Sequence, residues 1–399
     1  MLKYCWGTVL EVFLVFLKLG MTSFGGPAAH IGYFRDEFVN RRGWLKDKGY
    51  ADLVALCQFL PGPASSQVGM GIGLSRAGIP GAVAAWCGFT LPSAAFLIIF
   101  AQAVTIGGKY SDAGWLHGLK ILAVAVVAHA VISMARSFCN DRVSGTITIF
   151  SAAMALCVSA SWGQIAVIVI GACAGRLFLT SSSNEEYSGL NIPVGRITAY
   201  SCLTLFFSLL VLLPLMAAYW PNHLLAVVDR FYRVGALVFG GGHVVLPLLQ
   251  SAVSKGNWVD NELFMAGYGA AQAVPGPLFT FSAYLGAIMS PVPHGWIGGL
   301  ASLLAIFLPS FLLVIGLLPL WEKLRRNNAA KTSIAGVNAA VVGLLGAALY
   351  NPLWTNTIRT HNDFVLALAA FGLLAIWKLP PWKVVLVTAT AGLLIEALH

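Results

Sequence analysis

Long apolar segments separated by short polar stretches make up almost the whole chain. A helix needs about 17 to 25 apolar residues to cross roughly 30 Å of hydrocarbon. Nine unbroken segments come close to or reach this length. They lie near residues 79–105, 115–136, 144–160, 162–180, 196–220, 296–321, 333–350, 363–378 and 382–398. The pattern predicts an all-α integral membrane protein.

Four further apolar segments are interrupted in the middle. Glycines break two of them, at 25–26 and at 240–242, and the others carry Pro-Gly-Pro, at 61–63 and at 275–277. A continuous helix cannot pass through these points, because proline lacks a backbone N–H and glycine permits dihedrals that other residues avoid. Hydrocarbon offers the freed backbone groups no partner, so they must face protein, water or a ligand. Each break is therefore a candidate site.

The interruptions recur at a nearly constant spacing, which predicts a tandem duplication. The two Pro-Gly-Pro motifs are 214 positions apart and the two glycine breaks 215. Phe89 to Ser93 is echoed by Phe307 to Ser310, and Lys120 by Asn338, at offsets of 217 and 218. We predict a first repeat over 1–180, a linker with an unpaired helix over 181–222, and a second repeat over 223–399.

The distribution of basic residues favours a topology. With thirteen crossings, the basic loops at 41–48 and 323–331 would fall on opposite faces, against the positive-inside rule. If the four broken segments are re-entrant hairpins, nine helices cross from a cytoplasmic N-terminus, and most Lys and Arg residues face the cytoplasm. In both cases the unpaired helix at 196–220 leaves the halves inverted, as in many secondary transporters.

Composition narrows the function classes. The chain is 58% hydrophobic and only 10% charged, against about 25% charged in soluble domains. Its net charge of +9 arises from basic residues at segment ends, which are topology signals and do not predict nucleic-acid binding. The seven cysteines form no CxxC pair, so no metal site is predicted. With no catalytic constellation, nucleotide motif or cofactor motif, we expect a transporter driven by a gradient and not an enzyme.

Half-helix N-termini after the breaks are the candidate anion sites, because their N–H groups and the helix dipole both favour negative charge. Hydroxyl and amide side chains close behind each break add neutral donors. A simple kink is the alternative reading. The substrate-binding candidates at the breaks are Gly25, Gly26, Gly62, Ser65, Ser66, Gln67, Gly241, Gly242, His243, Gly276 and Thr280.

Charged and polar residues inside apolar segments supply further candidates. Burying Lys120 costs about 2.5 to 3.5 kcal/mol, which suggests a function, although its amine could instead reach the interface. Asn338 at the matching position is its neutral partner in substrate binding. Lys18 is a coupling or gating candidate or the ion-pair partner of Glu11. His243 is either a proton-coupled switch or a hydrogen-bond filler. Gln58 and Gln272 precede the Pro-Gly-Pro motifs and are expected to brace or gate them.

Several motifs together resemble the chromate ion transporter family in its long, two-domain form. They are Phe24-Gly25-Gly26-Pro27, Arg42-Gly43-Trp44-Leu45, Gln58 to Pro63, Phe239 to His243 and Gln272 to Pro277. The resemblance implies chromate export across the bacterial inner membrane, chromate resistance, and sulfate as a competing oxyanion. The second half replaces Pro27 by Gly242 and the Ser65-Ser66 pair by Phe279-Thr280, so we expect the first half to contribute more to binding.

Other functions remain compatible with these residues. One is uptake of sulfate or a related oxyanion, because direction cannot be read from sequence. Another, of a different class, is a lipid-handling protein such as a scramblase, since re-entrant hairpins also occur in such folds. The coupling ion and the oligomeric state stay open, a homodimer included.

Overall fold

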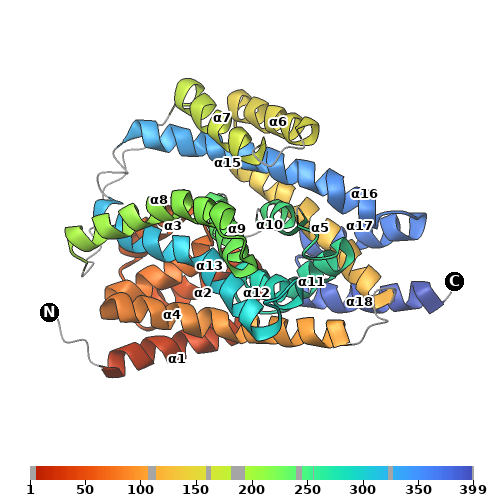
Figure 1. Ribbon diagram of the computed structural model, residues 1–399, viewed down its shortest axis with the longest axis horizontal. Helices are drawn as coiled ribbons and strands as arrows, with labels where there is room; N and C mark the ends of the chain where they lie inside the picture. Colours follow the sequence, from red (N-terminus) through yellow and green to blue (C-terminus); the bar gives the residue numbers. More distant parts are fainter. Residues whose placement is uncertain are drawn as a thin grey trace. The chain divides into compact units, whose positions relative to one another are not determined.

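The computed structural model describes residues 6–106, 114–158, 163–180, 194–239, 245–254, 256–321 and 327–397. These residues form helices, with no strand among them. They group into two compact units, and each unit draws on both predicted repeats (Figure 1). Unit 1 comprises Met1–Ala101, Ser183–Val245 and Val274–Arg326, and unit 2 comprises Gln102–Ser182, Leu246–Ala273 and Asn327–His399.

Unit 1 contains most of the broken helices. Its elements are α1 (Trp6–Thr22), α2 (Gly26–Arg35), the π-helix η1 (Asp36–Arg41), α3 (Asp47–Phe59), most of α4 (Ala64–Ile106), α8 (Arg196–Tyr219), α9 (His223–Leu237), η4 (Leu278–Thr280), α12 (Phe281–Ile288), α13 (Gly295–Leu317) and η5 (Leu318–Leu320). Helix α1 runs along the later part of α4, where Gly20 meets the backbone of Gly88 (Figure 1).

Three of the four predicted helix breaks are confirmed. Residues 23–25 separate α1 from α2, residues 60–63 separate α3 from α4, and residues 274–277 separate α11 from η4. The fourth break, at 240–242, lies outside the described residues. The glycines at the confirmed breaks have positive φ, which other residues adopt only with strain. Their φ values are 107° at Gly25, 77° at Gly26, 119° at Gly62 and 100° at Gly276.

Helix α4 folds back on itself shortly after it begins. The backbone leaves helical geometry at Ala77 and Gly78, and a Cβ on Gly73 would lie 2.2 Å from the carbonyl oxygen of Gly81. Eight residues of straight helix span about 12 Å, so the segments on either side of the turn must pack face to face. The second half repeats this turn: a Cβ on Gly286 in α12 would lie 2.2 Å from the carbonyl oxygen of Gly298 in α13.

The outer ends of the first-half hairpins lie together. Trp44 precedes α3, and the Arg76 guanidinium at the end of the first α4 segment lies over its ring, 5.0 Å from the centroid. Glu11, near the start of α1, pairs with Arg42, which follows η1. Each hairpin of the first half therefore begins and ends on the same side of unit 1.

Unit 2 is a bundle of helices with small residues at its contacts. Its elements are α5 (Gly114–Phe138), α6 (Arg142–Cys157), α7 (Gly163–Phe178), α10 (Val245–Ser254), α11 (Asn261–Ala273), α15 (Asn328–Ala348), η6 (Leu349–Trp354), α16 (Thr355–Thr357), α17 (His361–Ala375) and α18 (Pro381–Ala397). Helix α15 packs on α6 and α7, and α5 packs on α17 and α18 (Figure 1). Gly175 on α7 meets Gly336 on α15 backbone to backbone, as is common between helices in membranes.

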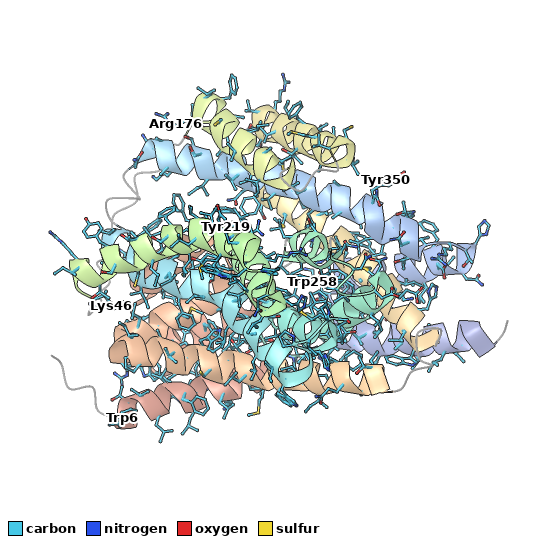
Figure 2. All side chains as sticks on the ribbon, viewed as in Figure 1. Trp6, Lys46, Arg176, Tyr219, Trp258 and Tyr350 are labelled. Carbon is cyan, nitrogen blue, oxygen red and sulfur yellow. The ribbon has the colours of Figure 1, made fainter. Side chains whose placement is uncertain are left out.

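The chain has the apolar helices of a multi-pass membrane protein. Within the described residues, five helical stretches are long and apolar enough to cross a membrane, and six shorter apolar helices accompany them. Only 11% of the apolar window of α8 is buried, which suits a helix that faces lipid. Trp6 and Tyr219, at the ends of α1 and α8, are strongly exposed (Figure 2), as aromatic residues at membrane interfaces often are.

Candidate functional site

Two backbone hydrogen bonds join the broken helices of the two halves inside unit 1. The N–H of Gly62 donates to the carbonyl oxygen of Val238 at 2.6 Å, and the N–H of Gly276 donates to that of Ser23 at 3.0 Å. In the predicted repeat, Gly276 corresponds to Gly62 and Val238 to Ser23. The Pro-Gly-Pro break of each half therefore bonds to the glycine break of the other. We call these four residues the junction.

A serine from each half lies against the Pro-Gly-Pro break of the other half, although the two serines make different hydrogen bonds. Ser93 on α4 donates from Oγ to the carbonyl oxygen of Pro275. Its counterpart on α13, Ser310, accepts from Gln67 Nε2 at 3.3 Å, and Gln67 also donates to the carbonyl oxygen of Pro61 at 2.6 Å. A Cβ on Gly62 would lie 2.4 Å from Ser310 Oγ, and a Cβ on Gly276 would lie 2.3 Å from Ser93 Oγ. Only glycine fits at either position.

His30 on α2 connects the two breaks of the first half. Its side chain is buried, with Nε2 3.2 Å from the carbonyl oxygen of Ser23 and Nδ1 3.4 Å from Ser65 Oγ. A carbonyl oxygen can only accept, so Nε2 carries the proton and Nδ1 of the neutral ring accepts from the Ser65 hydroxyl. The sequence interpretation missed His30. Its spacing of four residues from Gly26, one helical turn, was the available signal.

Within the described part of the chain, helix α4 of the first half offers unpartnered donors at the junction, beside one unpartnered acceptor, the buried Oε1 of Gln67. Helix α4 starts at Ala64, and the N–H groups of a first helical turn have no acceptor within the helix. Among the described residues, Ser66 Oγ is buried without a hydrogen-bond partner, as is Thr90 Oγ1 further along α4. By contrast, the hydroxyl of Thr280 donates to the carbonyl oxygen of Pro277. The arrangement suits an anion held by neutral donors at a helix N-terminus.

Three of the predicted site residues belong to unit 2. Lys120 Nζ lies 3.5 Å from Glu262 Oε2 at the start of α11, and the lysine side chain is 12% exposed. The Oδ1 atom of Asn338 is buried without a partner among the described residues. Gln272 Nε2 is also buried without a partner among the described residues. Their part in the same site as the junction stays a prediction.

Of the remaining predicted site residues, some are exposed on the surface and the others lie outside the described residues. Lys18 and Gln58 are exposed on α1 and α3. The alternative of an ion pair between Lys18 and Glu11 is wrong, because the Glu11 carboxylate pairs with Arg42 and Arg76. Gly241, Gly242 and His243 lie outside the described residues. A role for them stays a prediction.

Comparison with known proteins decides the family. The family model described as "Chromate transporter" matches residues 10–176 and 225–393, most of the chain. The chain belongs to the chromate transporter family. It is 27% identical to a chromate transport protein of Pseudomonas aeruginosa over 96% of this chain and 91% of that protein. It is 26% identical to a chromate transport protein of Cupriavidus metallidurans, with 93% and 89% covered.

A further relative has no stated substrate. An uncharacterized transporter of Methanocaldococcus jannaschii is 28% identical over 85% of this chain and 83% of that protein. No solved structure matches the chain. Membership in the chromate transporter family supports a role in chromate transport and implies a transporter and not an enzyme.

The pair Lys120 and Glu262 can be tested in this family member by a double-mutant cycle. We expect Lys120→Met and Glu262→Gln each to lower the thermal stability of the purified protein, because each leaves one charge without its partner. The double variant should be more stable than the sum of the single effects predicts, by about 0.2 to 1 kcal/mol of coupling, because the Glu262 side chain is 45% exposed. Additive effects would show that the two charges do not interact.

Proposed function

We propose that this chain is a secondary transporter that exports chromate from the bacterial cytoplasm across the inner membrane, driven by an ion gradient or by exchange, and so confers chromate resistance. The observation that carries the proposal is the reciprocal junction of Ser23, Gly62, Val238 and Gly276 in a member of the chromate transporter family. Broken helices whose ends meet inside the protein are typical of the substrate sites of secondary transporters.

The proposed topology has nine crossings, with the broken segments as re-entrant hairpins and the two repeats inverted. The meeting of Arg76 with Trp44, and of Arg42 with Glu11, supports the hairpins of the first half, since each starts and ends on one side of unit 1. The positive-inside rule assigns that side to the cytoplasm. The two matches to one family model, over 10–176 and 225–393, support the duplication.

The proposed binding site is the N-terminus of α4 beside the junction. Chromate is a tetrahedral dianion, and the first-turn N–H groups of α4 with the Ser66 hydroxyl would replace part of its hydration shell. The second half offers less, because a three-residue 3-10 helix stands between its Pro-Gly-Pro motif and α12 and the Thr280 hydroxyl is bonded locally. This supports the expectation that the first half contributes more to binding.

The junction also suggests how the two halves move together. Each half gives one donor, from Gly62 or Gly276, and one acceptor, from Val238 or Ser23. Because both halves contribute broken helices to unit 1, a movement of the first-half helices against the second-half helices inside this unit must strain or exchange both bonds at once. We propose that this pair of bonds couples these helices during alternating access.

The function is tested with membrane vesicles from cells that express the chain. We expect everted vesicles, whose cytoplasmic face is outward, to accumulate labelled chromate when energised, and sulfate to compete because its size and charge are similar. Ionophores that collapse the proton or sodium gradient would identify the coupling ion. Uptake confined to right-side-out vesicles would reverse the proposed direction. Movement of lipid probes in liposomes without any dependence on oxyanions would favour a scramblase.

A further inference from the structure

Two arginines from different hairpins of unit 1 share one carboxylate. Arg42 Nη1 lies 3.1 Å from Glu11 Oε1, and Arg76 Nη2 lies 3.5 Å from Glu11 Oε2. Each oxygen of the Glu11 carboxylate therefore faces a different guanidinium. Arg42 follows η1, Arg76 ends the first segment of α4, and Glu11 lies on α1. We call Arg42 and Arg76 the arginine pair.

Other side chains hold the arginine pair in place without Glu11. Both guanidiniums lie over the ring of Trp44, with the central carbons 5.5 Å and 5.0 Å from its centroid. The Trp44 ring in turn packs at 5.0 Å from that of Phe38. Arg42 Nε also bonds to Glu37 Oε1 at 2.7 Å. Stacking on an aromatic ring is worth about 0.5 to 1 kcal/mol at exposed sites, so both guanidiniums retain a contact when Glu11 leaves.

We propose that the arginine pair is a second oxyanion site, at which the Glu11 carboxylate takes the place of a tetrahedral dianion such as chromate or sulfate. The inference rests on the proposed function, because it assigns this site to the same substrate. Guanidiniums recognise oxyanions through paired N–H donors, and two of them match two oxygens of a single anion. Arg42, Arg76 and Glu11 are partly exposed, which lets a solute reach them.

Local charge favours a dianion once Glu11 is withdrawn. Besides the pair, the cluster contains Arg41, which bonds to Glu37. Three arginines and two glutamates leave this cluster at +1 with Glu11 in place and at +2 without it. The Arg76 contact to Glu11 is long for an ion pair, and exposed pairs of this kind contribute roughly 0.2 to 1 kcal/mol. Exchange of Glu11 for a dianion is therefore not prevented by a strong internal bond.

The arginine pair belongs to the first half alone. In the repeat alignment Ala226 stands where the first half has Glu11, and Gly256 stands where it has Arg42. No arginine or lysine lies between Gly286 and Gly298, the stretch that corresponds to the turn after Arg76. The site is therefore present on one side only, where the hairpins of the first half begin and end. In the proposed topology this is the cytoplasmic side, from which an exporter takes its substrate.

The test compares oxyanion binding to purified protein in lipid-free detergent. We expect the wild-type protein to bind one equivalent of labelled chromate or sulfate, at the junction. The Glu11→Gln variant should bind a second equivalent. The Kd of this second equivalent should be about tenfold lower than the Kd of any second equivalent that binds to wild type. Arg42→Gln with Arg76→Gln in the Glu11→Gln background should remove this second equivalent. Arg35→Gln is the control. Arg35 pairs with Asp47 and lowers the pKa of the Asp47 carboxyl. The substitution therefore removes one basic charge from the same part of the chain but leaves the Glu11 contacts unchanged.

The outcomes separate this inference from the proposed function. A first equivalent lost in Gly62→Leu, with no second equivalent in Glu11→Gln, would overturn the arginine site and leave the proposed function standing. No binding in any variant would overturn both. A phospholipid headgroup presents the same chemistry, so one arm adds short-chain phosphatidic acid: binding of lipid but not of sulfate or chromate would overturn the site as one for substrate. If Glu11→Gln does not fold, Glu11→Asp should give a smaller gain of about threefold, and no gain would count against the proposal.

Discussion

Substituting Gly62 with alanine is expected to abolish chromate transport. At φ of 119° a residue with a Cβ costs about 1 to 3 kcal/mol of backbone strain. The new Cβ would also lie 2.4 Å from Ser310 Oγ and 2.6 Å from Gln67 Nε2. Relief of either contact displaces the Gly62 N–H from the carbonyl oxygen of Val238. Initial rates of labelled chromate uptake into everted vesicles, normalised to the amount of inserted protein, measure the effect.

The matching glycine of the second half, Gly276, gives the same prediction and so tests the junction a second time. Gly276→Ala should reduce the rate as strongly, because its Cβ would lie 2.3 Å from Ser93 Oγ and its N–H holds Ser23. Gly346→Ala is the matched control, since a Cβ there meets nothing within 4 Å. If Gly62→Ala keeps more than half of the wild-type rate, or if Gly346→Ala loses as much as the other two, the junction is not the site of transport.

The helix breaks could be predicted from sequence because they depend on local chemistry. Pro61 and Pro63 remove backbone donors wherever they stand, and Gly62 permits a positive φ without help from the rest of the fold. The partner of the Gly62 N–H could not be predicted. Its acceptor, Val238, lies 176 positions away and contributes only a carbonyl oxygen, which every residue has. The repeat offsets show which residues are equivalent and not which of them touch.

The difference between local chemistry and long-range contacts also explains which residues of the candidate site could be predicted from sequence. Ser66 was predicted from its place behind Pro63, and the structure leaves its hydroxyl without a partner among the described residues. Thr280 was predicted from the matching place in the second half, yet its hydroxyl bonds to its own turn, a local choice that the residue type leaves open. Ser93 and Ser310 were visible only as markers of the repeat, because nothing in their sequence neighbourhood shows that they face the opposite half.

His30 carries the second large prediction. We expect His30→Leu to lower the transport rate by at least about tenfold, the factor that a loss of 1.4 kcal/mol produces. Leucine cannot replace the hydrogen bonds to the carbonyl oxygen of Ser23 and to Ser65 Oγ, and leaving buried polar groups unpaired costs about 1 to 3 kcal/mol. The carbonyl oxygen of Ser23 also accepts a hydrogen bond from the N–H of Gly276. Loss of the His30 hydrogen bond therefore also affects a residue of the junction. Vesicle uptake and the thermal stability of purified protein are the two measurements.

A conservative variant shows whether His30 acts through its hydrogen bonds or through its size. The side chain of His30→Gln can donate from Nε2 to Ser23 and accept at Oε1 from Ser65, so its rate should lie between those of His30→Leu and wild type. His361→Leu, at an exposed position on α17, is the control and should transport normally. Equal loss in His30→Gln and His30→Leu with unchanged stability would mean that the imidazole is needed for its proton. If His30→Leu and His30→Gln transport chromate as fast as the control His361→Leu, the link that His30 makes between Ser23 and Ser65 has no part in transport.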